Sequence, residues 1–167
     1  MRAPERLRPE HNLSLFENGK HPALDDWLRL RALVSEGLSA RTYVIGPDAE
    51  PDRVAGYYAL SSAQAERVIM PTAKLRKAMP EHVPLLLIGR LAVDKTQHGK
   101  GLGVGLLIDG LRRCVAAAQL VGVRAIVAHA IDDDAVAFYL KHYFLLSPLG
   151  ARTVVLPIES ALALVGD

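Results

Sequence analysis

The spacing of apolar residues along the 167-residue chain changes from a helical period near the N-terminus to a strand-like pattern further on. Five apolar residues between positions 23 and 36 recur near the helical spacing: Leu24, Trp27, Leu28, Leu30 and Val34. This pattern predicts a helix that ends at Gly37. Residues 41–45 are rich in β-branched and aromatic side chains and are followed by a Gly-Pro-Asp turn. The segment 54–61 predicts the strand that returns from this turn, so the two segments form a hairpin.

The remainder of the chain predicts strands that alternate with helices. We expect strands at 65–70, 83–93, 125–130 and 153–157, a short basic helix at 71–79, a helix that follows a glycine-rich segment and reaches about residue 120, and a helix that begins at 132–134. The strand at 83–93 is apolar on both faces, which is typical of a buried central strand. This order indicates a layered α/β or α+β fold with one mixed sheet. The length predicts a single domain over residues 1–167.

Composition narrows the class of protein. Half of the residues are hydrophobic, and 20 Lys and Arg against 18 Asp and Glu give a formal charge of +2, which excludes a disordered acidic or polybasic tail protein. A nucleic-acid partner stays open, because local patches of charge matter more than the sum. Cys114 is the only cysteine, so an internal disulfide and a zinc site of three or four thiolates are excluded. The chain lacks the apolar stretch of a signal peptide or membrane span, so we expect a soluble cytoplasmic protein.

Four glycines alternate with other residues between the strand at 83–93 and the helix that follows it: Gly99, Gly101, Gly103 and Gly105. Backbone amides approach a ligand closely only where side chains are absent, and a helix N-terminus adds unpaired N–H groups and partial positive charge. The segment therefore predicts a cradle for a phosphate or pyrophosphate. Its spacing fits neither the dinucleotide pattern G-x-G-x-x-G nor a Walker loop, since Lys100 is not followed by Ser or Thr. A strand-to-helix turn without a ligand is the alternative.

The strand and the glycine-rich loop together resemble the acetyl-CoA site of the GNAT N-acetyltransferases, whose pattern is Gln/Arg-x-x-Gly-x-Gly/Ala. Gly101 and Gly103 match its last two positions, whereas His98 stands where Gln or Arg is usual. The resemblance implies the GNAT fold, a mixed and mostly antiparallel central sheet flanked by helices, with acetyl-CoA in the cleft between two splayed central strands. It also implies that backbone groups of ten residues hold the pantetheine arm and pyrophosphate of coenzyme A: Leu91, Ala92, Val93, His98, Gly99, Lys100, Gly101, Leu102, Gly103 and Val104.

Five further motifs occur in order along the chain, at 23–28, 40–44, 56–60, 87–94 and 137–139, and the set is similar to the GNAT toxins of bacterial type II toxin–antitoxin modules. This resemblance covers about residues 10 to 157. It implies that an acetyl group is moved from acetyl-CoA to the α-amino group of an aminoacyl-tRNA, which blocks translation. It also implies a ribbon-helix-helix antitoxin as partner, and such toxins are commonly homodimers.

Acetyl transfer from a thioester to an amine needs a neutral amine and a proton for the leaving thiolate. A free α-amine has a pKa of about 7.7–8.0, so a strong enzyme base is less necessary, and no Glu or His pair in the sequence marks one. Tyr139 matches the catalytic tyrosine of the family in its Phe-Tyr pair, and a phenol is protonated at neutral pH and donates to a developing thiolate. We expect a backbone N–H near Val93 to polarise the carbonyl group.

An RNA acceptor requires cationic groups around the site. The candidates are Arg41, Lys74, Arg76, Lys77, Arg90 and Lys95. Tyr143 stands where family members often have glycine; it either narrows the acceptor pocket or covers the core, and we favour the second. We favour a core role for His129 as well, and we expect Cys114 to be a buried inert thiol. The three aspartates at 132–134 are interpreted as a helix cap and dipole partner rather than as metal ligands, so we expect no metal.

Two other functions stay open from the sequence. One is a GNAT enzyme that acetylates a protein N-terminus or a small amine. The other is a non-catalytic module that binds coenzyme A and regulates a partner. Replacing Tyr139 with Phe separates the last from the enzymes, because a binding module loses nothing.

Overall fold

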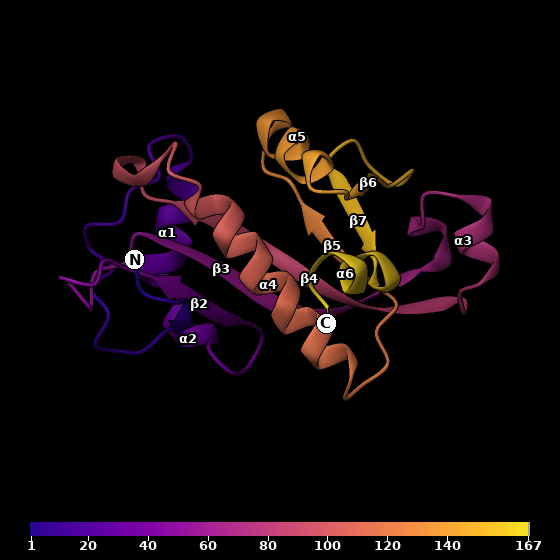
Figure 1. Ribbon diagram of the computed structural model, residues 1–167, viewed down its shortest axis with the longest axis horizontal. Coiled ribbons are helices and arrows are strands. Elements are labelled where there is room, and N and C mark those ends of the chain that lie inside the picture. The colour runs from indigo at the N-terminus through magenta and orange to yellow at the C-terminus, as the bar shows by residue number, and fades with distance from the viewer. Residues whose placement is uncertain (167) are drawn as a thin grey trace. The chain divides into compact units, whose positions relative to one another are not determined.

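The computed structural model describes residues 1–166 and has helices and strands in mixed order (Figure 1). The strands are β1 (Glu5–Arg6), β2 (Arg41–Ile45), β3 (Gly56–Glu66), β4 (His82–Val93), β5 (Ala125–His129), β6 (Leu145–Leu146) and β7 (Thr153–Pro157). The helices are α1 (Pro22–Leu30), α2 (Ala32–Ser35), α3 (Ala73–Lys77), α4 (Leu102–Ala118), α5 (Asp133–Lys141) and α6 (Ile158–Val165), with 3-10 turns at Arg67–Ile69 and Lys95–Gln97.

The strands have the order β1-β2-β3-β4-β5-β7-β6. The pairs β1–β2, β2–β3, β5–β7 and β6–β7 are antiparallel, and β4–β5 is parallel, so the predicted mixed, mostly antiparallel sheet is confirmed. The parallel ladder joins Leu85–Ile88 to Ala125–Ala128. Residues 89–93 of β4 lie beyond this ladder.

The chain divides into two compact units. The first contains Met1–Ser61 and Gly89–Gly110, and the second contains Ser62–Ile88 and the chain from Leu111. Strands β3 and β4 and helix α4 each contribute residues to both units.

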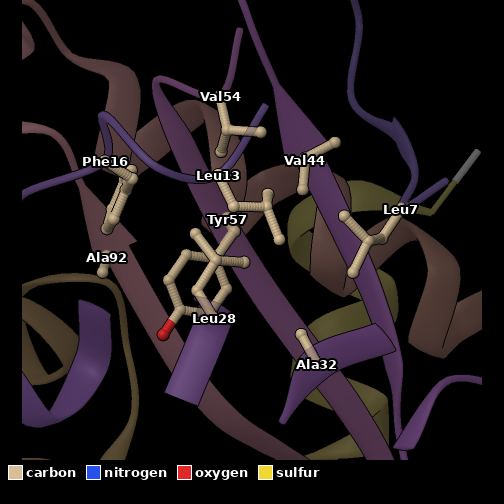
Figure 2. Close-up of a cluster of buried hydrophobic side chains, with 9 residues drawn as sticks. All are labelled: Leu7, Leu13, Phe16, Leu28, Ala32, Val44, Val54, Tyr57 and Ala92. Carbon is tan, nitrogen blue, oxygen red and sulfur yellow. The ribbon is translucent and has the colours of Figure 1, made fainter. Parts of the chain in front are cut away.

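One core of the first unit surrounds the buried ring of Tyr57 on β3 (Figure 2). Phe16 meets this ring edge-on, with centroids 5.5 Å apart. The Tyr57 hydroxyl donates to the Leu24 carbonyl of α1 at 2.7 Å. Helix α1 adds the buried Leu28, and β4 adds Ala92. The apolar stripe of α1 therefore covers the face of the sheet on which Tyr57 and Ala92 lie.

Helix α4 packs on the opposite face of the same strands. Tyr58, the neighbour of Tyr57, is fully buried with Leu106 of α4, and its hydroxyl donates to Asp109 of that helix. Leu91 and Val93 of β4 pack into this second cluster. Neighbouring residues of a strand point to opposite faces of the sheet, so Tyr57 packs against α1 and Tyr58 packs against α4. These contacts hold the first half of α4 against the strands.

The second unit has its own core, formed by the first half of β4 together with β5 and β7. Its central members are Val83, Val127 and Val155, with Met70 packed against them from the segment after β3. Ser147 ties that segment down by donating to the Ile69 carbonyl at 2.8 Å. Helix α5 follows β5 in this unit and carries the Phe-Tyr pair.

Two sequence predictions are wrong in detail. The helix expected over 23–36 divides into α1 and α2, because Arg31 leaves the helical conformation at φ −121°. The strand expected at 65–70 does not form, because β3 continues to Glu66 and a 3-10 turn follows. That turn buries Ile69, which the sequence pattern placed on a strand.

No helix in the described part of the chain combines the length and the apolar character needed to cross a membrane.

Candidate functional site

The turn at the end of β4 is built on the buried carboxylate of Asp94. One oxygen accepts from the backbone N–H and the hydroxyl of Thr96, at 3.0 and 2.7 Å, and the other accepts from the Glu17 N–H at 3.0 Å. Burial acts to raise the pKa of Asp94, but these hydrogen bonds outweigh it and hold the pKa below its usual value. The ionised carboxylate therefore fixes the path of the chain as it leaves β4.

The glycine-rich loop exposes bare backbone. Gly99 and Gly101 both have φ +77°, a conformation that favours glycine, and a Cβ at either position would meet nothing within 4 Å. The first turn of α4 begins at Leu102, and the Gly105 N–H donates to the Gly101 carbonyl at 3.1 Å. The amides before Gly105 are the N–H groups that a helix leaves without an internal partner. Open space, amide donors and the positive end of a 17-residue helix fit a phosphate group.

His98 closes the loop against β4. Its Nε2 lies 2.9 Å from the Val93 carbonyl oxygen and donates to it, since a carbonyl only accepts. The side chain that replaces the usual Gln or Arg thus serves the shape of the loop. Lys100 is exposed, and its Nζ lies 3.4 Å from Gln97 Oε1.

Tyr139 lies on α5, in the second unit, with a fixed ring. The side chain is 5% exposed, and its ring meets Phe138 and Phe144 at centroid distances of 5.4 and 5.1 Å. Burial raises the pKa of the phenol, so it is protonated at neutral pH. Its hydroxyl has no hydrogen-bond partner among residues 1–166. A protonated donor on a packed ring, with no acceptor among the described residues, is suited to give its proton to a substrate.

Tyr143 ends α5 in a left-handed conformation. The Tyr143 N–H donates to the Leu140 carbonyl and the Phe144 N–H to the Tyr139 carbonyl, which is the Schellman pattern that normally has glycine at this position. Tyr143 has φ +75°, and its side chain is 67% exposed. The interpretation that it covers the core is therefore wrong. Phe144, one residue later, is the buried ring.

Three other predictions are settled by burial and hydrogen bonds. His129 is exposed at the end of β5, with Nδ1 3.2 Å from Thr153 Oγ1, so the interpretation as a core residue is wrong. Asp132 caps α5 by accepting from the Ala135 N–H at 2.7 Å, as expected. Cys114 is fully buried, as expected, and burial raises the pKa of its thiol to about 12. Residues 1–166 contain no group of three or more metal-ligating side chains.

The six predicted cations differ in how they are engaged. In the first unit, Arg41 lies 3.7 Å from Glu36 and Lys95 lies 3.0 Å from Glu17, so both charges are partly neutralised. Arg90 instead lies over the ring of Trp27, 4.3 Å from its centroid.

The other three cations belong to α3 in the second unit. Arg76 donates to the Met70 carbonyl at 2.9 Å, whereas Lys74 and Lys77 are exposed. The sequence missed two residues that shape the site: Asp94, whose only signal is its place after a strand, and Trp27, which was assigned to the apolar stripe of a helix.

Comparison with known proteins gives consistent matches over nearly the whole chain. No family model matches the sequence. A tRNA-acetylating toxin of Mycobacterium tuberculosis (strain ATCC 25618 / H37Rv) is 41% identical over 166 residues, which cover 99% of this chain and 97% of that protein. A tyrosine-to-phenylalanine mutant of KacT has a TM-score of 0.90 at 27% identity, with 97% of this chain and 98% of that chain covered.

Two solved structures with bound groups are also similar. AtaTR bound with AcCoA has a TM-score of 0.82 at 25% identity, with 97% of this chain and 96% of that chain covered. AtaT complexed with acetyl-methionyl-tRNAfMet has a TM-score of 0.89 at 24% identity, with 97% and 98% covered, and supports the fold alone.

Proposed function

Because the chain belongs to the tRNA-acetylating toxins of the GNAT family, we propose that it transfers an acetyl group from acetyl-CoA to the α-amino group of an aminoacyl-tRNA and so blocks translation. The observation that carries this proposal is the 41% identity with the M. tuberculosis toxin over 99% of the chain. The family and the GNAT fold expected from the sequence motifs are thereby confirmed.

Acetyl-CoA is the co-substrate in this proposal. The amides of the loop from Gly99 to Val104 bind the pyrophosphate, which the bare backbone and the positive end of α4 support. The backbone of Leu91, Ala92 and Val93 binds the pantetheine arm, because these residues lie beyond the parallel ladder that ends at Ile88. The related structure of AtaTR bound with AcCoA supports this choice of co-substrate.

The chemical step exchanges one acyl bond for another. The neutral α-amine attacks the thioester carbonyl, the new C–N bond forms, and the C–S bond breaks with its electron pair left on sulfur. Tyr139 donates its hydroxyl proton to that thiolate. The amine releases its proton to solvent, and the Tyr139 phenolate takes up a proton from solvent, which restores the phenol for the next turnover. A pKa of about 7.7–8.0 for an α-amine leaves a large neutral fraction at neutral pH, so the step needs no dedicated base.

RNA binding is assigned to cations that the protein does not neutralise. Lys74 and Lys77 are exposed on α3, which has a basic last turn and no acidic residue in its first turn. Arg76 holds the segment before α3 by its bond to Met70. Arg41 and Lys95, each paired with a glutamate, contribute less.

We further propose the assembly and location that the family implies: a homodimer, a ribbon-helix-helix antitoxin and a cytoplasmic location, where aminoacyl-tRNA is found. Related structures include AtaT bound to the C-terminus of the antitoxin AtaR and a KacTA–DNA complex. Residues 1–167 are proposed to form a single domain, since β3, β4 and α4 each belong to both compact units.

The test is transfer of radiolabelled acetyl groups from acetyl-CoA to total bacterial tRNA charged with all amino acids. We expect label in the RNA fraction of charged tRNA and none in uncharged tRNA. Label confined to polypeptide in a translation extract would instead favour an enzyme that acetylates protein N-termini. Binding of acetyl-CoA without transfer to either acceptor would favour a regulatory module.

A further inference from the structure

Arg90 is a half-buried cation on β4 without an anionic partner among the described residues. Its guanidinium carbon lies 4.3 Å from the centroid of the Trp27 ring. The carboxylate of Asp25, which is also on α1, accepts from the backbone and side-chain nitrogens of Asn18 at 3.0 and 2.7 Å. A guanidinium removed from much of the water without a carboxylate to pair with favours an anionic ligand from outside the chain.

The aromatic support under Arg90 is rigid. Trp27 stacks on Tyr57 with centroids 6.0 Å apart and an interplanar angle of 10°. Tyr57 is fully buried, and its hydroxyl donates to the Leu24 carbonyl of α1. Because Trp27 of α1 stacks on Tyr57 of β3, and Tyr57 is in turn bonded to α1, the Trp27 ring is held in place. It therefore holds the planar guanidinium of Arg90 in one position. This arrangement lowers the conformational entropy that the arginine loses on binding a ligand.

Arg90 lies on the face of β4 that is opposite to the α4 helix, whose first turn follows the glycine-rich loop. Arg90 and Ala92 are two residues apart, so they share a face, and Ala92 packs with Tyr57 in the α1 core (Figure 2). Leu91 and Val93 point to the other face and pack against the buried cluster that contains Tyr58 and Leu106 of α4. Arg90 is thus on the α1 face, opposite the helix whose first turn is proposed to bind the pyrophosphate of coenzyme A.

Phosphate is the anion that both substrates of the proposed reaction carry, and a guanidinium fork matches its oxygens. Since the loop for the coenzyme begins on the α4 face, the position of Arg90 favours the other substrate. Single-stranded RNA ends offer accessible phosphates to arginine side chains. We propose, on the basis of the proposed function, that Arg90 binds a phosphate of the single-stranded 3′ end of the aminoacyl-tRNA, with Trp27 as its positioning residue.

The test compares Arg90→Gln with the wild-type protein in steady-state acetylation of total charged tRNA at several salt concentrations. We expect the KM for tRNA to rise about tenfold, which is the loss of one charge-assisted contact. We expect kcat and the KM for acetyl-CoA to stay unchanged. The slope of log KM against log salt falls by about 0.7, the value for one phosphate contact on a single strand.

Trp27 variants separate positioning from charge. Trp27→Leu keeps the charge of Arg90 but removes its aromatic support, so the KM for tRNA rises about threefold while the salt slope stays at the wild-type value. Trp27→Phe retains a ring face and restores the KM. Melting temperatures of all variants are measured to confirm that each is folded.

Arg53→Gln is the matched control, because it removes one positive charge from a partly exposed arginine that is already 3.2 Å from Glu50. It is expected to leave both the KM for tRNA and the salt slope unchanged. An unchanged KM and slope in Arg90→Gln would overturn the proposal. So would a raised KM for acetyl-CoA with an unchanged KM for tRNA, since the phosphate would then belong to coenzyme A. Failure of the proposed function is a separate result, because the wild-type protein would already leave charged tRNA unlabelled.

Discussion

Tyr139 has a ring and a hydroxyl in different environments, which makes its role testable by removal of one atom. The ring packs between Phe138 and Phe144, whereas the hydroxyl has no partner among the described residues. We predict that Tyr139→Phe lowers kcat by about 10²- to 10⁴-fold, the range of a lost proton donor. The melting temperature and the KM for acetyl-CoA change little, because no hydrogen bond within the protein is lost.

The matched control for Tyr139→Phe is Tyr143→Phe. It removes the hydroxyl of an exposed tyrosine just after the same helix, and kcat is expected to stay at the wild-type value. Steady-state rates with saturating acetyl-CoA give the kcat of both variants. A Tyr139→Phe protein with full activity would remove Tyr139 from the mechanism.

Tyr143 differs from Tyr139, because its backbone is strained and its side chain makes little contact with the protein. A left-handed conformation costs a residue with a Cβ about 1–2 kcal/mol. We predict that Tyr143→Gly stabilises the protein by about 1 kcal/mol, and a change of that size raises the melting temperature by about 2–4 °C in a chain of this length.

Tyr143→Ala is the control, because it removes the same ring but keeps the Cβ, and it is expected to give no gain. A lower melting temperature for Tyr143→Gly than for Tyr143→Ala would show that the conformation at this position is not what limits stability.

The role of a single residue was predictable from the sequence only where a local motif marks it. Tyr139 could be singled out because a Phe-Tyr pair on a helix is a local motif, and its catalytic role stays a prediction. The exposure of Tyr143 was not found, because a positive φ at a position usually occupied by glycine leaves no mark in the apolar pattern. Trp27 was assigned to the stripe of α1, since the sequence does not show that Arg90, 63 positions later, lies over its ring.

At the scale of elements, the glycine-rich loop joins a strand to a helix and uses its glycines for different purposes. Gly101 needs its positive φ, whereas Gly105 lies within α4. We predict that Gly101→Ala destabilises the protein by about 1 kcal/mol and raises the dissociation constant for acetyl-CoA at least tenfold, because the strained turn moves the amides. Calorimetric titration of acetyl-CoA measures the second effect.

Gly105→Ala is the matched control for Gly101→Ala. A Cβ at Gly105 also meets nothing within 4 Å, and alanine favours a helix by about 1 kcal/mol over glycine. The variant is therefore expected to be at least as stable as the wild-type protein and to bind acetyl-CoA normally. Equal affinity for acetyl-CoA in both variants would contradict the assigned role of the loop.

Helices and strands were predictable where the apolar residues follow one clear pattern along the chain. The central strand and the long helix α4 were found from apolar runs and a glycine-rich start. The segment at 65–70 was misread because Val68, Ile69 and Met70 have the composition of a strand. Ile69 and Met70 are instead buried by tertiary contacts in the second unit, and Val68 is exposed. The short strands β1 and β6 have two residues each, which is too few for any pattern.

At the scale of the whole molecule, the class of fold was predictable, but the strand order was not. Strand β7 pairs with both β5 and β6, so its place depends on contacts between segments that are far apart in sequence. Local periodicity has no information about such pairings. The family motifs supplied the mostly antiparallel character of the sheet, which the periodicity did not, and the single domain over 1–167 stays a prediction.

The central claim is that the acetyl group is placed on the α-amino group of an aminoacyl-tRNA. The most direct measurement is mass spectrometry of the 3′-terminal nucleoside, released by nuclease after total charged tRNA has been incubated with the protein and acetyl-CoA. The account predicts an aminoacyl-adenosine that is heavier by one acetyl group, with the added mass on the amino acid fragment. Unmodified aminoacyl-adenosine, or an acetyl group on the nucleoside itself, would contradict it.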